Sequence, residues 1–239
     1  GFSQVVSFDG VDDFAETSSS GSEGFNTIPG PFTMTAWVKP AKQNQIGGIV
    51  ATSSANSIAS EVIYQTGDRF IFQYENIADL LITQTKVSPG FWYHLAATYD
   101  GARLKFYVNG ILEAEKTTIQ LPTDTNRLRI GKARTLLGEL RFAGDIDAVS
   151  YWEAALSINQ IQSLSQFGVT GSEPKLNAYW DWDNGSGAED AWDYGNRVRN
   201  LKLNGGAMRT SVSPLTALDF GYSAGSKPET FANWQQTFS

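Results

Sequence analysis

The sequence predicts an all-β protein, an antiparallel two-sheet sandwich with one short helix. Three observations lead to this prediction. Short runs of β-branched and aromatic residues recur along the chain, turn-forming residues separate nearly all of them, and only one segment has a convincing helical pattern. A parallel α/β sheet would need helices that alternate with the strands, whereas many short strands at this spacing are typical of a sandwich.

The expected strands are rich in Val, Ile, Thr, Phe, Tyr and Trp, because these side chains fit the half-buried surface of a pleated sheet. Gly, Pro, Asn, Asp and Ser lie between them and favour turns. In chain order the expected strands are residues 5–8, 32–38, 49–52, 61–65, 70–74, 80–85, 93–99, 103–108, 111–117, 128–130, 140–142 and 145–152.

Two turns predict a β-meander in the middle of the chain. Asp100-Gly101 and Asn109-Gly110 favour tight hairpins, because two consecutive positive φ angles are least costly for Asn or Asp followed by Gly. The two turns separate three of the expected strands, which therefore pair as neighbours.

One helix is expected after the last expected strand, residues 145–152. Ser157 and Gln160 have the spacing of a capping box, and Gly168 follows as a stop signal. The apolar stripe between these signals consists of Ile158, Ile161 and Leu164. We expect this helix to cover an edge of the sandwich.

Composition limits the possible partners. The 239 residues are 41% hydrophobic and can bury the core of a single domain. The formal net charge of -7 and the absence of a dense basic cluster argue against nucleic acid, and no apolar run approaches the roughly 18 residues needed for membrane insertion. The lack of Cys excludes disulfides, thiolate zinc sites and a cysteine nucleophile. Because the chain begins at Gly1, we expect it to derive from something longer.

Four blocks of sequence resemble the laminin-G-like jelly-roll group of the concanavalin A-like lectin and glucanase superfamily. They are SFDGVDDFAE (7–16), FTMTAWVKP (32–40), WYHLAATYDGARLKFYVNG (92–110), and LRIGKA continuing to GELRFAGDIDAVSYWEAALSINQI (128–161). The resemblance implies a jelly-roll arrangement of the two sheets. One departure is that Ala148 follows Asp147, where the family pattern has a second acidic residue.

The segment 176–206 resembles a strand and Gly-rich loop that often precede the first block in this family. Here it follows the helix, and we interpret it as a permuted part of the same sandwich. We therefore expect one domain over residues 1–218, followed by a C-terminal extension over 219–239. The strand near Tyr179 to Trp182 should join the same sheet system as residues 5–8, because an unpaired edge strand is an aggregation liability.

Acidic residues suggest a calcium site. Asp9 and Asp12 lie with Asp13 in a Gly-containing turn, and Asp145 and Asp147 lie on a later strand that the fold brings close to the first. Calcium takes several oxygen ligands, and the resemblance implies that some relatives bind it here. We predict ligands among Asp9, Asp12, Asp145 and Asp147; the alternative is a set of turn caps and solvated strand ends.

No catalytic group stands out. His94 is the sole histidine and fits a structural role in its strand. Glu113 and Glu115 alternate without a third acidic residue in register, so a solvated face is the better interpretation than a glucanase acid pair.

Trp192 and Tyr194 are the predicted ligand-binding residues. They lie in a polar, Gly-rich region where a flat ring can stack on a sugar and a nearby Asp can accept hydroxyl hydrogen bonds. Other tryptophans fall on strand positions that match core packing.

These features favour an extracellular or cell-surface module that binds a polysaccharide or glycoconjugate, with calcium as a cofactor. A polysaccharide-degrading enzyme of the same superfold, and a structural domain that contacts protein neighbours in a larger chain, remain alternatives.

Overall fold

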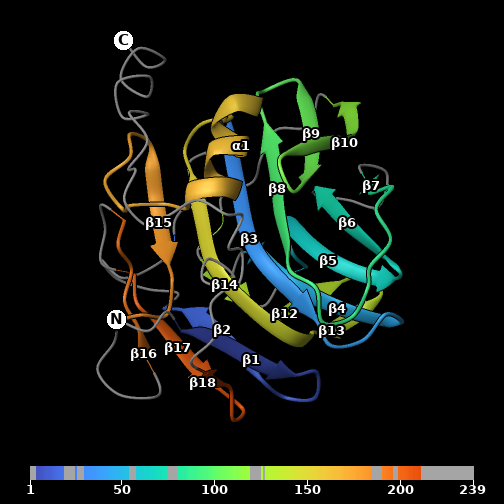
Figure 1. The fold of residues 1–239 in the computed structure, drawn as a ribbon, viewed down its shortest axis with the longest axis vertical. Helices are drawn as coiled ribbons and strands as arrows, with labels where there is room; N and C mark the ends of the chain where they lie inside the picture. Colours follow the sequence, from blue (N-terminus) through green and yellow to red (C-terminus); the bar gives the residue numbers. More distant parts are fainter. Residues whose placement is uncertain are drawn as a thin grey trace.

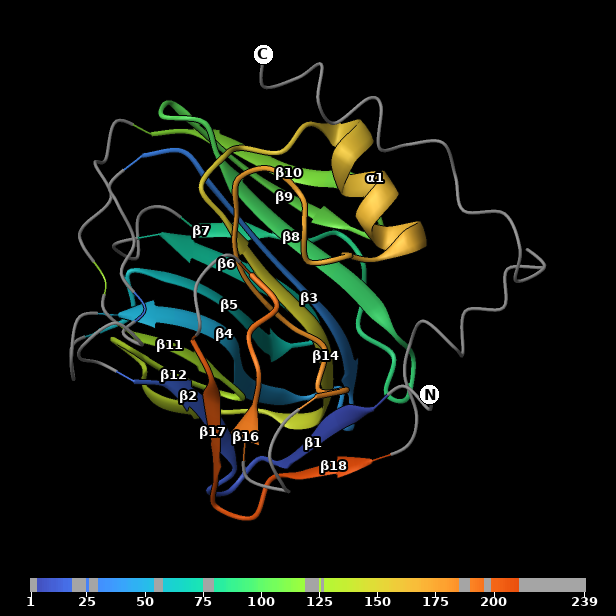
Figure 2. The same ribbon diagram turned by 90° about the vertical axis from the view of Figure 1, so that its left-hand side faces the viewer.

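The computed structural model describes residues 4–18, 25, 30–53, 58–74, 80–118, 125, 127–184, 190–195 and 199–210. These residues form two large antiparallel sheets packed face to face, a two-stranded hairpin and one helix (Figures 1 and 2). The predicted all-β sandwich with one helix is confirmed. The expected extension over 219–239 lies outside the described residues.

The first sheet, sheet A, contains the central meander. Its order is β10 (Ile111–Thr117), β9 (Arg103–Val108), β8 (Tyr93–Tyr99), β3 (Phe32–Pro40), β14 (Ala143–Trp152), β1 (Val5–Asp9) and β18 (Met208–Thr210), and β15 (Leu176–Trp180) also pairs with β14.

The second sheet, sheet B, packs against it. Its order is β16 (Asp190–Ala191), β17 (Leu201–Asn204), β2 (Phe14–Thr17), β11 (Arg127–Ile130), β4 (Gln45–Ser53), β5 (Glu61–Gly67), β6 (Arg69–Tyr74) and β7 (Leu80–Ile82). The separate hairpin consists of β12 (Lys132–Thr135) and β13 (Gly138–Arg141).

Strand β14 has partners along both of its edges. One edge pairs with β3, while the other pairs first with β1, from Ala143 to Ile146, and then with β15, from Val149 to Trp152. A bulge separates the two halves, and Ala148 there has a φ of 49°. The Asp147 carboxylate accepts a hydrogen bond of 2.7 Å from the Ala148 amide and supports this bulge. The late strand β15 thus lies in the same sheet as β1.

The two hairpin turns of the meander differ in conformation. Asn109 and Gly110 have φ values of 50° and 76°, as the sequence predicts. At the other turn only Gly101 has a positive φ, of 101°, so the prediction of two positive angles is wrong there. Instead, the Asp100 carboxylate accepts hydrogen bonds of 2.9 and 2.7 Å from the amides of Ala102 and Arg103, because an Asp side chain can itself close a turn.

The hairpin β12–β13 lies directly on strand β4, which begins at Gln45, four residues before the predicted start. A Cβ atom on Gly48 would lie 2.4 Å from the backbone nitrogen of Ala133, so only glycine allows this approach. The glycines that weaken the strand signal in the sequence are therefore required by the tertiary packing.

Aromatic rings dominate the core between the sheets. The buried ring of Phe32 lies with its centroid 5.7 to 6.2 Å from those of Phe72, Tyr74, Tyr99 and Tyr151. These separations are typical of favourable aromatic pairs, so the cluster links β3, β6, β8 and β14 across the two sheets.

Helix α1 (Ile158–Phe167) begins with the predicted capping box. The Ser157 side chain accepts from the Gln160 amide, and the Gln160 side chain accepts from the Ser157 amide. Its Ile161 and Leu164 pack with Trp152 over the outer face of sheet A, so the helix covers a sheet face instead of the expected edge (Figure 2).

His94 is buried on this same outer face and is 2% exposed. Its ring centroid lies 5.3 Å from that of Trp37, the residue opposite it on β3. Within the described part of the chain its Nδ1 atom has no hydrogen-bond partner. Burial lowers the pKa of His94 to about 3, so the ring is neutral in the folded protein and has the structural role expected from the sequence.

Glu113 joins the exposed edges of the two sheets. The register of β10 on β9 shifts between Leu112 and Ala114, so Glu113 lies in a bulge. Its carboxylate accepts hydrogen bonds of 2.7 and 2.8 Å from the amides of Gln84 and Thr85, and another from the Thr85 hydroxyl. The expectation of a solvated face is therefore wrong for Glu113, because the bulge breaks the alternation on which that expectation rests.

We predict that Glu113→Ala lowers the free energy of unfolding by about 2–3 kcal/mol, since three hydrogen bonds to a charged group are lost. Glu115→Ala is the matched control, because Glu115 is exposed and forms a 3.9 Å ion pair with Arg103; its loss should cost at most about 0.5 kcal/mol. Urea unfolding of both variants measures the difference. Equal losses would contradict a bridging role for Glu113.

We predict that acid destabilises the fold through His94. Because its folded pKa of about 3 lies below the unfolded value of 6.5, its contribution to stability is complete above pH 6.5 and is lost as pH falls toward 3. The loss should reach up to about 1.4 kcal/mol for each pH unit.

Urea unfolding from pH 7.5 to pH 4.5, with His94→Gln as the comparison, isolates this effect. Asp181 and Asp193, whose folded pKa values are raised to about 6, act with the opposite sign, but they do so in both proteins and cancel. Parallel pH profiles for the two proteins would show that His94 is not the responsible group.

Candidate functional site

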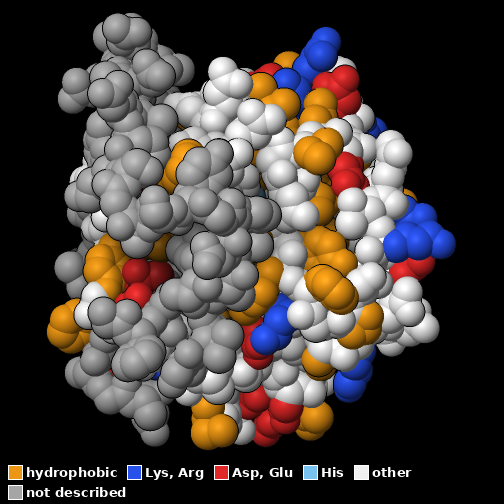
Figure 3. Space-filling view, viewed as in Figure 1, with side chains coloured by type: hydrophobic (Ala, Val, Ile, Leu, Met, Phe, Trp, Pro, Cys, Tyr) orange, Lys and Arg blue, Asp and Glu red, His pale blue; other side chains and the backbone are white. Residues whose placement is uncertain are grey.

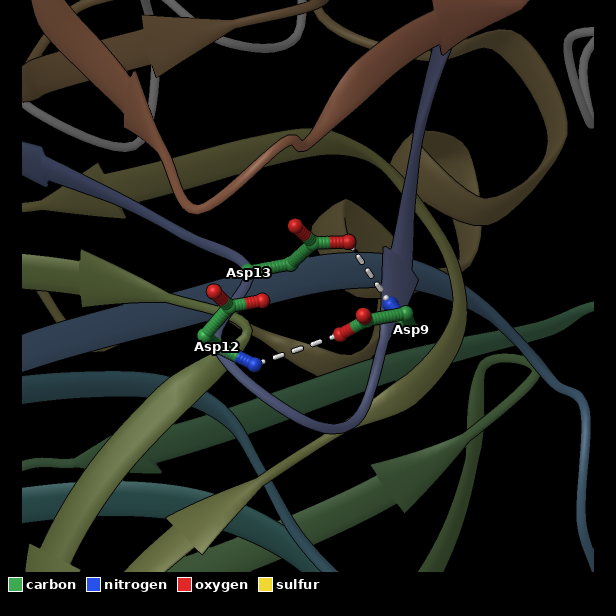
Figure 4. Close-up of side chains that lie close together, drawn as sticks. All are labelled: Asp9, Asp12 and Asp13. Atoms are coloured by element: carbon green, nitrogen blue, oxygen red, sulfur yellow. Dashed lines mark hydrogen bonds between the residues drawn. The ribbon is translucent and has the colours of Figure 1, made fainter.

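An acidic loop follows the first strand and contains Asp9, Asp12 and Asp13. One carboxylate oxygen of each of these residues lies within 4.8 Å of the others (Figure 4). Asp9 Oδ1 accepts hydrogen bonds from the amides of Val11 at 2.7 Å and Asp12 at 3.3 Å, while Asp13 Oδ2 accepts from the Asp9 amide at 2.9 Å. The loop is thus held by its own acidic side chains, as in an Asx turn.

The carboxylates of this acidic loop differ in their environments. The Val11 amide is the main cause that lowers the pKa of Asp9, whereas burial, followed by the nearby charges of Asp9 and Asp12, raises the pKa of Asp13. Asp9 and Asp12 are exposed and Asp13 is buried. Three clustered carboxylates offer the hard oxygen ligands that calcium takes, so the donor set fits this cation.

The other two predicted calcium ligands lie on β14. As the sequence predicts, β1 and β14 are neighbours, but Asp145 lies opposite Ser7. Its Oδ1 accepts from the Ser7 hydroxyl at 2.6 Å, and its Oδ2 forms a 2.5 Å ion pair with Lys39. Asp147 is 1% exposed and supports the bulge. In the described chain the acidic group that could hold a metal therefore combines Asp9 and Asp12 with Asp13.

Trp192 and Tyr194 lie between β16 and β17, at one end of the sandwich. Trp192 is 48% exposed, and Tyr194 is half-buried with its ring centroid 5.9 Å from that of Tyr179. The Trp192 amide donates to the Asn184 carbonyl at 3.2 Å, and the Tyr194 amide donates to the Tyr179 carbonyl at 2.8 Å. These two bonds place residues 179–184 beside residues 192–194.

Three carboxylates belong to these two segments. We call the group formed by Asp181, Asp183, Trp192, Asp193 and Tyr194 the aromatic corner. Asp193 Oδ1 accepts hydrogen bonds from the amides of Tyr179 and Gly195 at 2.9 and 2.6 Å, and Asp183 Oδ1 accepts from the Gln4 amide at 2.6 Å.

Burial and neighbouring charges shift the pKa values of residues in the aromatic corner. Burial raises the pKa of both Asp181 and Asp193 to about 6. Burial, together with the charges of Asp181 and Asp183, raises the pKa of Tyr194 to about 12. The aromatic corner therefore combines an exposed ring with carboxyl groups that can accept or donate hydrogen bonds.

Neighbouring tryptophans contribute to the fold. Trp180 and Trp182 are buried, and their indole N–H groups donate to the carbonyls of Arg199 at 2.8 Å and Ile146 at 2.9 Å. The carboxylates of the aromatic corner were not among the predicted ligand-binding residues. The Asp-x-Asp spacing at 181 and 183 was the available signal, but only tertiary structure places it beside Trp192.

The described side chains that are visible in Figure 3 are of mixed character. Apolar side chains in orange lie scattered among polar and charged ones there, and the Lys and Arg side chains form small, separated groups. Among the described residues, no helix has the length and apolarity required to cross a membrane.

Comparison with known proteins identifies relatives at the level of sequence. A family model described as the concanavalin A-like lectin/glucanases superfamily matches residues 9–162. Pappalysin-1 of Mus musculus is 32% identical over 100 residues, which are 40% of this chain and 6% of that protein. Pappalysin-1 of Homo sapiens is 29% identical over 132 residues, or 53% of this chain and 8% of that protein. The chain thus corresponds to a small part of these relatives.

Solved structures share the fold at low sequence identity. A Bacteroides ovatus protein assigned to carbohydrate binding matches 89% of this chain and 60% of its own, with a TM-score of 0.68 and 18% identity. A heptameric SAP-like pentraxin from Limulus polyphemus matches 91% of this chain and 98% of its own, with a TM-score of 0.66 and 15% identity. With the family match, these similarities show a jelly-roll sandwich, and the chain belongs to the concanavalin A-like lectin/glucanase superfamily.

Proposed function

We propose that this chain is an extracellular carbohydrate-binding or adhesive module that binds a polysaccharide or glycoconjugate at the aromatic corner. The observation that carries the proposal is the 48% exposure of Trp192 beside the segment that contains Asp181 and Asp183. Half-exposure of a large aromatic ring next to fixed polar groups supports a binding surface at this position.

The chemistry of the aromatic corner suits a sugar. The apolar face of a pyranose ring can pack on the indole of Trp192, which removes apolar surface from water. The carboxylates accept hydrogen bonds from the sugar hydroxyls and fix its orientation. The relationship to the Bacteroides ovatus protein supports carbohydrate as the ligand class.

The positions of His94 and Glu113, the groups considered for catalysis, favour binding without hydrolysis. His94 is buried under the outer face of sheet A, and Glu113 accepts three hydrogen bonds at the sheet edges. Neither belongs to the aromatic corner, and a base must reach the proton that it removes.

We propose calcium as a cofactor held by the acidic loop, with Asp9, Asp12 and Asp13 as ligands. A cation would offset the mutual repulsion of these carboxylates, which contributes to the raised pKa of Asp13. Asp145 would support the neighbouring β1–β14 pair through Ser7 and Lys39 without contacting the ion.

We predict that Trp192→Ala weakens glycan binding by about 0.5–1.5 kcal/mol, because the stacking surface is lost. Phe91→Ala is the matched control, since Phe91 is 66% exposed outside the aromatic corner and its removal should leave binding unchanged. A glycan array followed by titration calorimetry on the best ligand measures both variants. Equal binding by Trp192→Ala and the unmodified chain would rule out this site.

We predict that millimolar calcium raises the melting temperature relative to chelator, because a ligand bound only to the folded state stabilises it by about 2.7 kcal/mol at 100 times its Kd. Asp12→Asn should abolish the shift. The control Asp68→Asn, which removes a carboxylate outside the acidic loop, should retain it. Identical melting curves of the unmodified chain with calcium and with chelator would show that the acidic loop is only a capped turn and does not bind calcium.

A further inference from the structure

The hairpin β12–β13 ends in two exposed leucines. Leu136 and Leu137 form its turn between Thr135 and Gly138, which lie opposite each other, and the exposed fractions of the two leucines are 62% and 61%. Turn positions favour Gly, Pro, Asn, Asp and Ser for reasons of backbone conformation and hydrogen bonding. The two leucines therefore leave apolar surface in water that neither the turn nor the core uses.

A third exposed aliphatic residue lies beside this turn. The Ala59 amide donates to the Arg134 carbonyl at 2.7 Å, which places the preceding residue, Ile58, near the end of the hairpin. Ile58 is 39% exposed. We call Ile58, Leu136 and Leu137 the apolar tip. Single exposed apolar residues are common on protein surfaces, whereas several in one region indicate an interaction site.

The body of the hairpin is fixed on sheet B, so the apolar tip is preorganised. Ala133 and Leu140 are buried in one cluster with residues of β4, β5 and β6. At the turn, Thr135 Oγ1 accepts a hydrogen bond of 3.1 Å from the Leu137 amide. A Cβ atom on Gly138 would meet no atom within 4 Å, so the turn projects into solvent. A preorganised projection loses little conformational entropy on binding.

The face of the hairpin that points away from sheet B is basic. Residues opposite each other in a hairpin share a face, so the pairs Lys132–Arg141 and Arg134–Glu139 place three cations and one anion together. Glu139 forms ion pairs with Lys132 at 3.2 Å and with Arg141. Arg134 is exposed and is the cation nearest to Leu136 along the strand. The hairpin thus has a local positive charge, although the formal net charge of the chain is -7.

Charges on the described segments around the hairpin do not reverse this sign. Strand β4, on which the hairpin lies, has no charged residue. On β11, Arg127 and Arg129 share the carboxylate of Glu16. The acidic loop lies at the base of the hairpin, away from its turn, where Arg141 donates to the Asp12 carbonyl at 3.0 Å. An anionic partner is therefore attracted at the turn.

The spacing of the leucines and the cations matches the depth of a bilayer interface. A strand advances about 3.3 Å per residue, so Arg134 lies roughly 7 Å from Leu136 along the hairpin, and Lys132 lies roughly 13 Å from it. Amphipathic elements bury their apolar side about 5–10 Å into the boundary between headgroups and acyl chains. With Leu136 at that depth, Arg134 lies among the headgroups, and anionic headgroups attract basic side chains near the surface.

We infer that the apolar tip attaches this chain reversibly to lipid bilayers with anionic headgroups. Leu136 and Leu137 enter the interface, while Arg134 contacts the headgroups. A projecting tip suits a bilayer, which deforms around inserted side chains, better than it suits a protein, which would need a matching apolar groove. The attachment requires no membrane-spanning segment, and it goes beyond the proposed function because it uses neither the aromatic corner nor the acidic loop.

A fluorescent label at the apolar tip tests insertion directly. The chain has no cysteine, so Leu136→Cys accepts a single environment-sensitive NBD group. Phe91→Cys is the matched control, because Phe91 is 66% exposed and follows Gly90, whose amide donates to the Pro40 carbonyl at the opposite end of the sandwich. The vesicles consist of phosphatidylcholine with about 30% phosphatidylserine, and a chelator in every sample excludes bridging by calcium.

We expect the emission of the label at position 136 to shift to shorter wavelength on these vesicles, and a quencher attached to the lipid acyl chains to reduce it. The label at position 91 should respond to neither. An unshifted, unquenched label at position 136 would overturn the inference.

Sedimentation of unlabelled chain with the same vesicles separates the apolar and basic contributions. The double variant Leu136→Ser, Leu137→Ser should bind at least about tenfold more weakly, because the apolar surface that enters the bilayer is lost. Arg134→Gln should weaken binding about fivefold, whereas Lys42→Gln, which removes an exposed cation before the start of β4, should not. Raising the salt from about 0.05 to 0.5 M should weaken binding of the unmodified chain. The altered side chains are exposed, so the melting temperatures should stay unchanged.

The possible failures have different signatures. Undiminished vesicle binding by the variant Leu136→Ser, Leu137→Ser would overturn the inference, because another surface would then be the point of attachment. Equal binding to vesicles of phosphatidylcholine alone, insensitive to salt, would overturn the role of anionic headgroups. Absence of binding to every vesicle would also overturn the inference and would favour a protein partner for the apolar tip. The vesicles contain no saccharide, so none of these outcomes affects the proposed function.

Discussion

The two-sided pairing of β14 is the constraint on which the rest of the structure depends. Backbone groups inside a sheet must find partners, and the ten residues of β14 direct their backbone groups alternately to its two edges. β3 satisfies one edge, while β1 and β15, which are far apart in the sequence, share the other. The bulge at Ala148 divides that edge between them, and it fixes where the late segment of the chain must return.

The functional surface that we propose is a consequence of this return. Once β15 pairs with the second half of β14, the chain must cross from sheet A to sheet B, where β16 and β17 pair beside β2. The crossing segments carry the aromatic corner. Sites on loops held by a rigid sandwich are common, because the sheets provide positional accuracy and the loops provide varied side chains.

Carboxylates in this molecule have different roles because their environments differ. Asp145 is neutralised by Lys39 within a sheet, Asp147 supports a bulge, and Glu113 joins two sheet edges. Asp9 and Asp12 remain exposed in a loop that suits a cation. Burial raises the pKa of Asp181 and Asp193 to about 6, and a carboxyl group can hydrogen-bond to hydroxyls in either protonation state.

The sequence by itself determined the sandwich, the meander and the capped helix, because these follow from local periodicity and turn chemistry. It missed β2, β12 and β16 to β18, since strands of two to four residues that contain charged side chains have no strong local signal. Only tertiary structure decided that Asp145 pairs with Lys39 instead of joining the acidic loop, and that the Gln4 amide contacts the aromatic corner. Such groupings depend on strand register and on a bulge, and both are set by contacts between residues far apart in the chain.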